Sequence, residues 1–378
     1  MPWENKTVED IREEFVHYAK ASGNISLACR EFGITRKTGY KWLERYTNNE
    51  DLKDRSRKPN KASNRTDIET ERLILDMREE NPGWGGKTIH DVLARQGYQG
   101  LPCAKTCNNI LKRYGWITSE ESMKHTPYVR FAREHCNELW QTDFKGDFLM
   151  RDGTRCFPLD ILDDCSRFSI LIEAKANTLG VTASFRQAFL EYGMPLAVLS
   201  DNGAQFAGFK GGYTSFEKWL MNHDILPMHG RIMHPQTQGK IERFHRTMKQ
   251  ELLNHRQFDN LAHAQKELSE WREKYNNIRP HSALGSLPPA EIYTPSSREY
   301  HDDIRKFEYE GYTRKVNAKG YLRFAHWQSY LSETMADEIV RIAESDAGDS
   351  FNIFYRNFKI AEVDAHNGRL LNRKISRR

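Results

Sequence analysis

The segment Leu139-Trp-Gln-Thr-Asp-Phe-Lys-Gly-Asp-Phe-Leu149 decides the fold of the middle of this chain. Its aromatic and apolar residues predict a strand over residues 140–149. The next four residues, Arg151-Asp-Gly-Thr154, predict a hairpin turn with positive φ at Asp152 and Gly153. Further strands are expected at residues 155–162 and 168–174. We therefore predict three consecutive antiparallel strands.

Strands and helices alternate beyond this hairpin. The apolar patterns predict strands at residues 196–199 and 226–231 and helices at residues 178–192, 216–223, 239–254 and 260–275. Three antiparallel strands followed by strand–helix units is the ribonuclease-H-like order, a mixed sheet with helices on both faces. We assign this α/β domain to residues 135–296.

Two blocks of three short helices precede the α/β domain. The first block, residues 1–48, has helix-capping side chains at Thr7, Asn24 and Thr35 and a tight turn at Gly33. The second block, residues 67–117, repeats this order with helices expected at residues 67–80, 87–95 and 103–114. Both blocks are predicted to be helix-turn-helix domains. Residues 49–66 and 118–134 are predicted linkers.

Basic side chains in these blocks are candidates for DNA binding. Arg36, Lys37 and Lys41 lie on the outer side of the third helix, whereas Tyr40, Trp42 and Leu43 are expected to pack. The second block offers Lys105 and Asn108. The basic first linker offers Arg55, Arg57 and Lys58, which would follow phosphates or enter the minor groove. The alternative is a small helical bundle with a solvated basic face and a solvated tether.

The last part of the chain, residues 305–378, follows a proline-rich stretch. Five short β-like segments within it predict a small SH3-like β-barrel, and the chain ends in a basic tail. The expected fold class is therefore multidomain α+β: two helix-turn-helix domains, an α/β ribonuclease-H-like core and a C-terminal barrel.

Three carboxylates stand in places that suit metal ligands. Asp143 lies in the first strand of the core, Asp201 directly follows a buried strand, and Glu242 is in the first turn of a helix. Hard Mg²⁺ takes oxygen ligands, and a pair of ions can clamp the attacking and leaving oxygens of a phosphoryl transfer. The pattern predicts two Mg²⁺ ions per site, with Mn²⁺ as a substitute.

The helix that carries Glu242 also carries cations on the same face. Arg246 and Lys249 follow Glu242 at i+4 and i+7, and we predict that they contact DNA phosphates. The alternative is a surface ion pair between Glu242 and Arg246, worth little. Asp163 and Asp164 are expected to pair with Arg167 and fix the strand end.

Composition sets wider limits. The chain has 378 residues, 38% hydrophobic residues and a net charge of +5, which fits several domains and a polyanionic partner. No membrane span and no signal peptide are expected. The six scattered cysteines predict a reducing cytoplasm. We expect Cys103 and Cys107 to pack as small buried residues. A zinc site that includes them and His90 is a minor alternative.

Four ordered motifs carry a resemblance to a known family: Trp140-Gln-Thr-Asp143, Leu162-Asp-Asp-Cys-Ser-Arg167, Ser200-Asp-Asn-Gly203 and His234-Pro-Gln-Thr-Gln-Gly-Lys-Ile-Glu-Arg-Phe-His-Arg246. Together they resemble the integrase core of bacterial insertion-sequence transposases and retroviral integrases. The resemblance implies an acidic DDE triad on Asp143, Asp201 and Glu242. The Asp201–Glu242 spacing exceeds the usual one, and residues 208–214 are expected to be a loop insertion.

The resemblance implies a DNA transposase. Such an enzyme binds the terminal inverted repeats of its element, hydrolyses a phosphodiester at each end and joins the 3′-OH to target DNA. It implies a dimer or higher oligomer on double-stranded DNA, in the cytoplasm of a bacterium and associated with the nucleoid. The alternatives are a DNA-binding regulator with an inactive core, which the three acids argue against, and a ribonuclease-H-type nuclease, which the helix-turn-helix units argue against.

Overall fold

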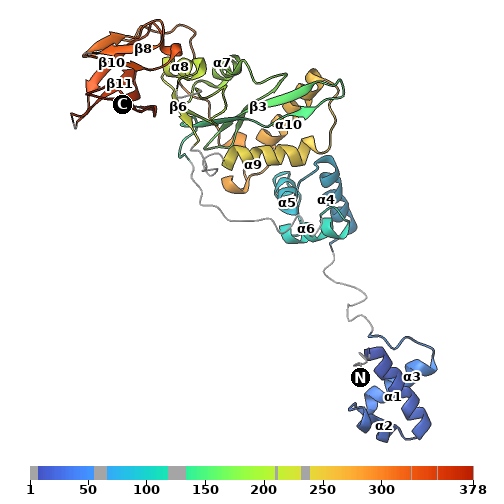
Figure 1. Ribbon diagram of the computed structural model, residues 1–378. Coiled ribbons are helices and arrows are strands. Elements are labelled where there is room, and N and C mark those ends of the chain that lie inside the picture. The colour runs from blue at the N-terminus through green and yellow to red at the C-terminus, as the bar shows by residue number, and fades with distance from the viewer. Residues whose placement is uncertain are drawn as a thin grey trace. The chain divides into compact units, whose positions relative to one another are not determined.

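The computed structural model describes residues 7–54, 66–117, 133–208, 212–230, 239–324, 326–346 and 348–377. The chain divides into two compact units, Met1–Arg65 and Thr66–Arg378. Figure 1 shows the helices and strands of both units. The candidate DNA contacts Arg55, Arg57 and Lys58 and most of both predicted linkers lie outside the described residues.

The first unit contains the three expected helices, α1 (Val8–Ser22), α2 (Ile25–Glu31) and α3 (Arg36–Thr47). Thr7, Asn24 and Thr35 each cap a helix through their side-chain oxygen, as predicted. Phe15, Val16 and Trp42 form the centre of its core. The expectation that Tyr40 packs was wrong, because its side chain is 58% exposed beside the basic residues of α3.

The second helical block packs against the α/β core. It comprises α4 (Ile68–Glu80), α5 (Gly86–Arg95) and α6 (Ala104–Arg113) around a core of its own that includes Ile89 and Leu111. The Lys87 Nζ donates to Ser286 Oγ at 2.8 Å, and Arg95 pairs with Glu291. These contacts attach α5 to the segment that follows the last core helix.

The core contains one six-stranded mixed sheet. Its strands are β1 (Trp140–Phe144), β2 (Phe148–Leu149), β3 (Arg155–Asp163), β4 (Ser169–Lys175), β5 (Ala197–Ser200) and β6 (Leu226–His229). β3 pairs antiparallel with β1, β2 and β4, whereas β1, β5 and β6 are parallel neighbours. This mixed order is the one predicted.

Two details of the predicted hairpin differ. The expected strand over residues 140–149 breaks between Phe144 and Phe148, where Gly146 has a φ of 87°. In the turn itself Gly153 has positive φ, but Asp152 does not. Asp152 instead accepts the amide of Thr154 at 2.9 Å, which shapes the turn without a left-handed aspartate.

Helices cover both faces of the sheet (Figure 1). On one face, α7 (Val181–Tyr192) and α8 (Ser215–Asn222) bury Phe185, Phe189 and Leu220 in a cluster with Trp140. On the other, α9 (Gly239–Met248) and α10 (Leu261–Asn277) bury a second cluster with β4 residues. The helix expected to run to Asn254 changes at Lys249–Leu253 into one π-helical turn, η4.

The C-terminal part forms two sheets and does not close into the predicted barrel. Its strands are β7 (Thr313–Lys315), β8 (Tyr321–Phe324), β9 (Trp327–Tyr330), β10 (Ile339–Glu344), β11 (Ser350–Tyr355), β12 (Phe358–Asp364), β13 (Leu370–Asn372) and β14 (Ser376–Arg377). β8 and β9 pair only with each other, and the remaining six form the larger sheet. The barrel prediction is therefore not confirmed.

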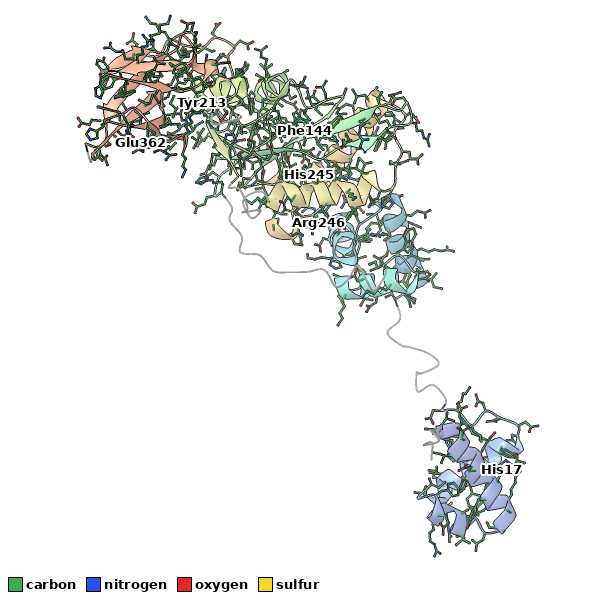
Figure 2. The ribbon with its side chains drawn as sticks, viewed as in Figure 1. His17, Phe144, Tyr213, His245, Arg246 and Glu362 are labelled. Atoms are coloured by element: carbon green, nitrogen blue, oxygen red, sulfur yellow. The ribbon has the colours of Figure 1, made fainter. Side chains whose placement is uncertain are left out.

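The segment predicted to be a loop insertion anchors these sheets to the core. The Tyr213 amide donates to Ser332 Oγ at 3.0 Å, its carbonyl accepts from Thr334 Oγ1 at 2.6 Å, and its hydroxyl donates to the carbonyl of Ile360. Tyr213 and Met221 are buried within the C-terminal hydrophobic cluster (Figure 2 labels Tyr213). We call this contact the Tyr213 anchor.

Among the described helices, none has the length and apolar character needed to cross a membrane. The six cysteines are free thiols. Cys107 is buried and contacts the carbonyl of Pro102, Cys103 is exposed, and His90 contacts Asp91. The described part of this region therefore shows packing for Cys107 and no group of three metal ligands.

Candidate active site

Asp143 and Asp201 lie on neighbouring parallel strands. β1 and β5 are in register with Gln141 opposite Leu199, so the chain reaches Asp143 and Asp201 two residues later on both strands. Because parallel strands end at the same edge of a sheet, the two carboxylates meet there. Asp201 begins a tight turn in which its Oδ1 accepts the Gly203 amide at 3.0 Å.

The surroundings of Asp143 disfavour its negative charge. Burial raises the pKa of this carboxyl from 3.8 to about 6; His245 opposes the rise, and the negative charge of Asp201 adds to it. Asp143 also lies opposite Asp160 in the register of β1 and β3. Burial likewise raises the pKa of Asp160, whose side chain is fully buried. Several carboxylates thus crowd one edge of the sheet.

α9 brings the third acid to the same edge. Glu242 is in its first turn and exposed, and His245 follows one turn later and is buried. His245 Nε2 lies 2.8 Å from Asp160 Oδ2, and its Nδ1 lies 3.9 Å from Asp143 Oδ2. Neither atom of the shorter contact has an aligned hydrogen-bond partner, so the two side chains form a close polar contact. Figure 2 labels His245 on α9 and Phe144 at the end of β1.

Carboxylate oxygens are the type of ligand that a hard cation prefers. The structure brings two of the three predicted carboxylates together, those of Asp143 and Asp201. All of the donors are oxygens, and the fully buried Asp160 carboxylate has no aligned hydrogen-bond donor. Within the described residues, however, no three His, Cys, Asp or Glu side chains converge closely enough to hold a metal ion. The structure therefore places Asp143 beside Asp201, with Glu242 on the adjoining helix and its side chain towards solvent.

The acids at the end of β3 differ from the expected Asp–Arg pair. Asp163 accepts the Ser166 amide and the Asn137 amide, both at 2.8 Å. Asp164 forms its ion pair with Lys240 of α9, and Arg167 instead donates to the Asp164 carbonyl. Asp164 also accepts from Gln141 of β1 at 2.7 Å. The prediction missed these roles because Lys240 and Gln141 are distant in sequence from the acids.

His245 was missed as well, although its spacing gave a signal. It follows Glu242 by three residues, which places both on one side of a helix. The sequence-based prediction gave roles on this helix to Glu242, Arg246 and Lys249, and none to His245. Both cations are exposed, and no ion pair among the described residues joins Arg246 to Glu242. The surface ion pair considered for this helix is therefore absent from its described residues, and Arg246 and Lys249 stay available to a polyanion.

The candidate DNA contacts of the helical blocks fall into two groups. Arg36, Lys37, Lys41 and Lys105 are exposed, and Lys41 Nζ lies 4.8 Å from the ring centroid of Trp42. Asn108 has a structural partner, because its Oδ1 accepts the Gly86 amide at 2.9 Å and so joins α6 to α5. The side-chain oxygen of this DNA-binding candidate is thus already engaged within the protein.

Family models match four parts of the chain. Two models described as integrase core domain match residues 133–235 and 223–289. A homeodomain-like domain model matches residues 38–111, and a helix-turn-helix domain model matches residues 11–60. The two core matches cover β1, β5 and α9, the elements that carry the three acids. The two helical matches cover the blocks that precede the core.

Relatives come from bacterial insertion elements. The "Insertion element IS407 uncharacterized 31.7 kDa protein" of Burkholderia multivorans is 31% identical over 58% of this chain and 78% of its own length. The "Insertion element IS476 uncharacterized 39.2 kDa protein" of Xanthomonas euvesicatoria is 34% identical over 41% of this chain, and the match spans only 44% of that relative.

A solved structure shows weaker similarity. The catalytic core domain of HTLV-2 integrase, in complex with magnesium, covers 42% of this chain and 97% of its own at 20% identity and a TM-score of 0.33. That score is too low to support more than local likeness. The insertion-element relatives and the integrase-core matches decide the family: this chain belongs to the bacterial insertion-sequence transposases with an integrase-type core.

Proposed function

We propose that this protein is a DNA transposase that cuts the ends of its mobile element and joins them to target DNA. The observation that carries the proposal is the meeting of Asp143 and Asp201 at one sheet edge, with the Glu242 helix tied to the same edge through His245. The raised pKa of Asp143 adds support, because a crowded carboxylate site favours a bound cation.

Asp143, Asp201 and Glu242 would hold the metal ions. Bound Mg²⁺, or Mn²⁺ in its place, would supply Lewis-acid activation of water and later of the 3′-OH, and would stabilise the leaving oxygen. The protein's own part is to fix these oxygen ligands on two strand ends and one helix. Closure of the Glu242 side chain towards the aspartates would complete the set.

The helical blocks would supply recognition of the terminal inverted repeats. Arg36, Lys37 and Lys41 present an exposed basic surface on α3, and Lys105 presents a further cation on α6. Arg246 and Lys249 would contact the phosphates near the scissile bond. Because two element ends must be cut and joined together, we propose a dimer or higher oligomer on double-stranded DNA.

The triad is tested by three single substitutions, Asp143→Asn, Asp201→Asn and Glu242→Gln. Each removes one ligand charge, so cleavage and strand transfer should fall by more than about 100-fold while binding to the element ends persists. Cleavage of labelled end DNA and filter binding are measured on the same preparations. Asp147→Asn is the matched control, because Asp147 is a core acid already paired with Arg155.

The outcomes separate the proposal from its rival. Full activity in any triad variant would remove that residue from the site. Specific end binding by the unaltered protein, with no metal-dependent cleavage under any condition that supports binding, would favour a DNA-binding regulator with an inactive core.

A further inference from the structure

The start of α9 is held to the core by a buried polar clamp formed by Gln141, Asp164 and Lys240. The Lys240 ammonium pairs with the Asp164 carboxylate and donates to the Asp164 carbonyl at 3.1 Å. Gln141 Nε2 donates to Asp164 Oδ1 at 2.7 Å, and Gln141 Oε1 accepts the Ile241 amide at 3.4 Å. The clamp therefore connects β1, the end of β3 and the residue directly before Glu242.

The contact to Ile241 gives one of the first amides of α9 an acceptor from outside the helix. The first amides of a helix have no acceptor within the helix, and a side-chain oxygen usually satisfies one of them. In α9 the Ile241 amide donates to the side-chain oxygen of Gln141, which lies on another element two residues before Asp143. The strand that carries one catalytic acid thus caps the helix that carries another.

The burial of the clamp argues against a role in binding DNA. The side chain of Lys240 is 15% exposed and that of Asp164 is 1% exposed, and Gln141 is buried. The Lys240 ammonium already has two acceptors on Asp164. Arg246 and Lys249 on the same helix are exposed, so they are the cations available to phosphates.

We propose that Gln141 and Lys240 are positioning residues that fix Glu242 relative to Asp143 and Asp201. This inference rests on the proposed function. His245 fixes α9 one turn beyond Glu242, and the clamp fixes it just before, so Glu242 lies between two attachments. Residues that orient a metal ligand typically change metal affinity by about 10-fold to 100-fold when they are replaced.

The test uses the full-length protein with Gln141→Leu, Lys240→Met and the neutral pair Asp164→Asn/Lys240→Gln, which removes both charges of the ion pair. Lys240→Arg is the conservative variant that should restore function. Lys175→Met is the matched control, because it breaks another largely buried ion pair of the core, with Glu173.

The first readout needs no metal. Amide hydrogen exchange at Ile241 in metal-free protein should be about 5-fold faster in Gln141→Leu, because its acceptor is lost. The second readout is the Mg²⁺ concentration that gives half-maximal cleavage of end DNA. This concentration should rise by about 10-fold in Gln141→Leu and Lys240→Met, while the rate at saturating Mg²⁺ stays near that of the unaltered protein.

If Gln141→Leu and Lys240→Met show the same hydrogen exchange and the same Mg²⁺ requirement as Lys175→Met, the positioning role is overturned and the proposed function stays intact. Failure of Lys240→Arg to recover the Mg²⁺ requirement, with its fold preserved, would also count against Lys240. Absence of metal-dependent cleavage by the unaltered protein would instead overturn the proposed function, and with it the role given to the clamp.

Discussion

Asp143 combines a proposed metal-binding position with an energetic penalty. Its carboxyl is largely buried beside Asp201 and Asp160, and burial raises its pKa to about 6 from 3.8. The folded protein therefore keeps a proton on Asp143 to a higher pH than the unfolded chain does. The contribution of Asp143 to the stability of the metal-free protein therefore falls as the pH rises from about 4 to about 6, and this loss is complete above that window.

Replacing Asp143 with Asn removes that penalty. In a chelator, Asp143→Asn should be more stable than the unaltered protein at pH 7.5, by up to about 3 kcal/mol, and within about 1 kcal/mol of it at pH 4. Thermal unfolding followed by tryptophan fluorescence measures both. Asp147→Asn serves as the control and should show no such pH-dependent gain. Equal stability of Asp143→Asn and the unaltered protein at both pH values would contradict the expected burial of charge.

At the scale of elements, the close packing of α5 on α6 depends on one glycine. A Cβ at Gly86 would lie 2.3 Å from the Asn108 backbone nitrogen and 2.9 Å from the Ala104 carbonyl oxygen. Backbone atoms cannot give way as a flexible side chain can. At the neighbouring Gly85, the nearest atom to an added Cβ would be 3.9 Å away.

Gly86→Ala should therefore destabilise the α4–α6 block by about 1–3 kcal/mol, because the two helices must separate. Gly85→Ala should cost less than about 1 kcal/mol. Hydrogen exchange in α5 and α6 of the full-length protein compares the two variants directly. Similar protection in both would show that the helices absorb the added methyl group.

Local pattern predicted most elements, and long-range partners account for what it missed. The caps at Thr7, Asn24 and Thr35 and the strand positions of Asp143 and Asp201 follow from nearest neighbours in sequence. The π-helical turn at Lys249–Leu253 has no such local mark. The Asp164–Lys240 pair and the closure of the C-terminal sheets depend on residues far apart in sequence. The sequence pattern paired Asp164 with Arg167 instead of Lys240. It also predicted a closed C-terminal barrel, which the structure does not show.

For the whole molecule, the Tyr213 anchor joins the α/β core to the C-terminal sheets. Tyr213→Ala should create a cavity and cost about 3–5 kcal/mol, the range found for large aromatic side chains. Hydrogen exchange should then quicken in both α8 and β12, on the two sides of the contact. Tyr312→Ala is the control, because Tyr312 belongs to the C-terminal part but is 43% exposed. Unchanged exchange in β12 of Tyr213→Ala would show that other contacts hold the sheets.

The same anchor determines how a shortened form of the protein would behave. Removing the C-terminal sheets would uncover Tyr213 and Met221, which complete a hydrophobic cluster with residues such as Leu331 and Ile353. An exposed apolar surface would then lie on the stretch of chain between Asp201 and Glu242. Aggregation or lost cleavage after such a deletion would follow from an uncovered core, and so would not identify a missing DNA contact. The core segment with Tyr213 and Met221 and the C-terminal sheets are separate in the sequence, but they share one hydrophobic cluster within one compact unit.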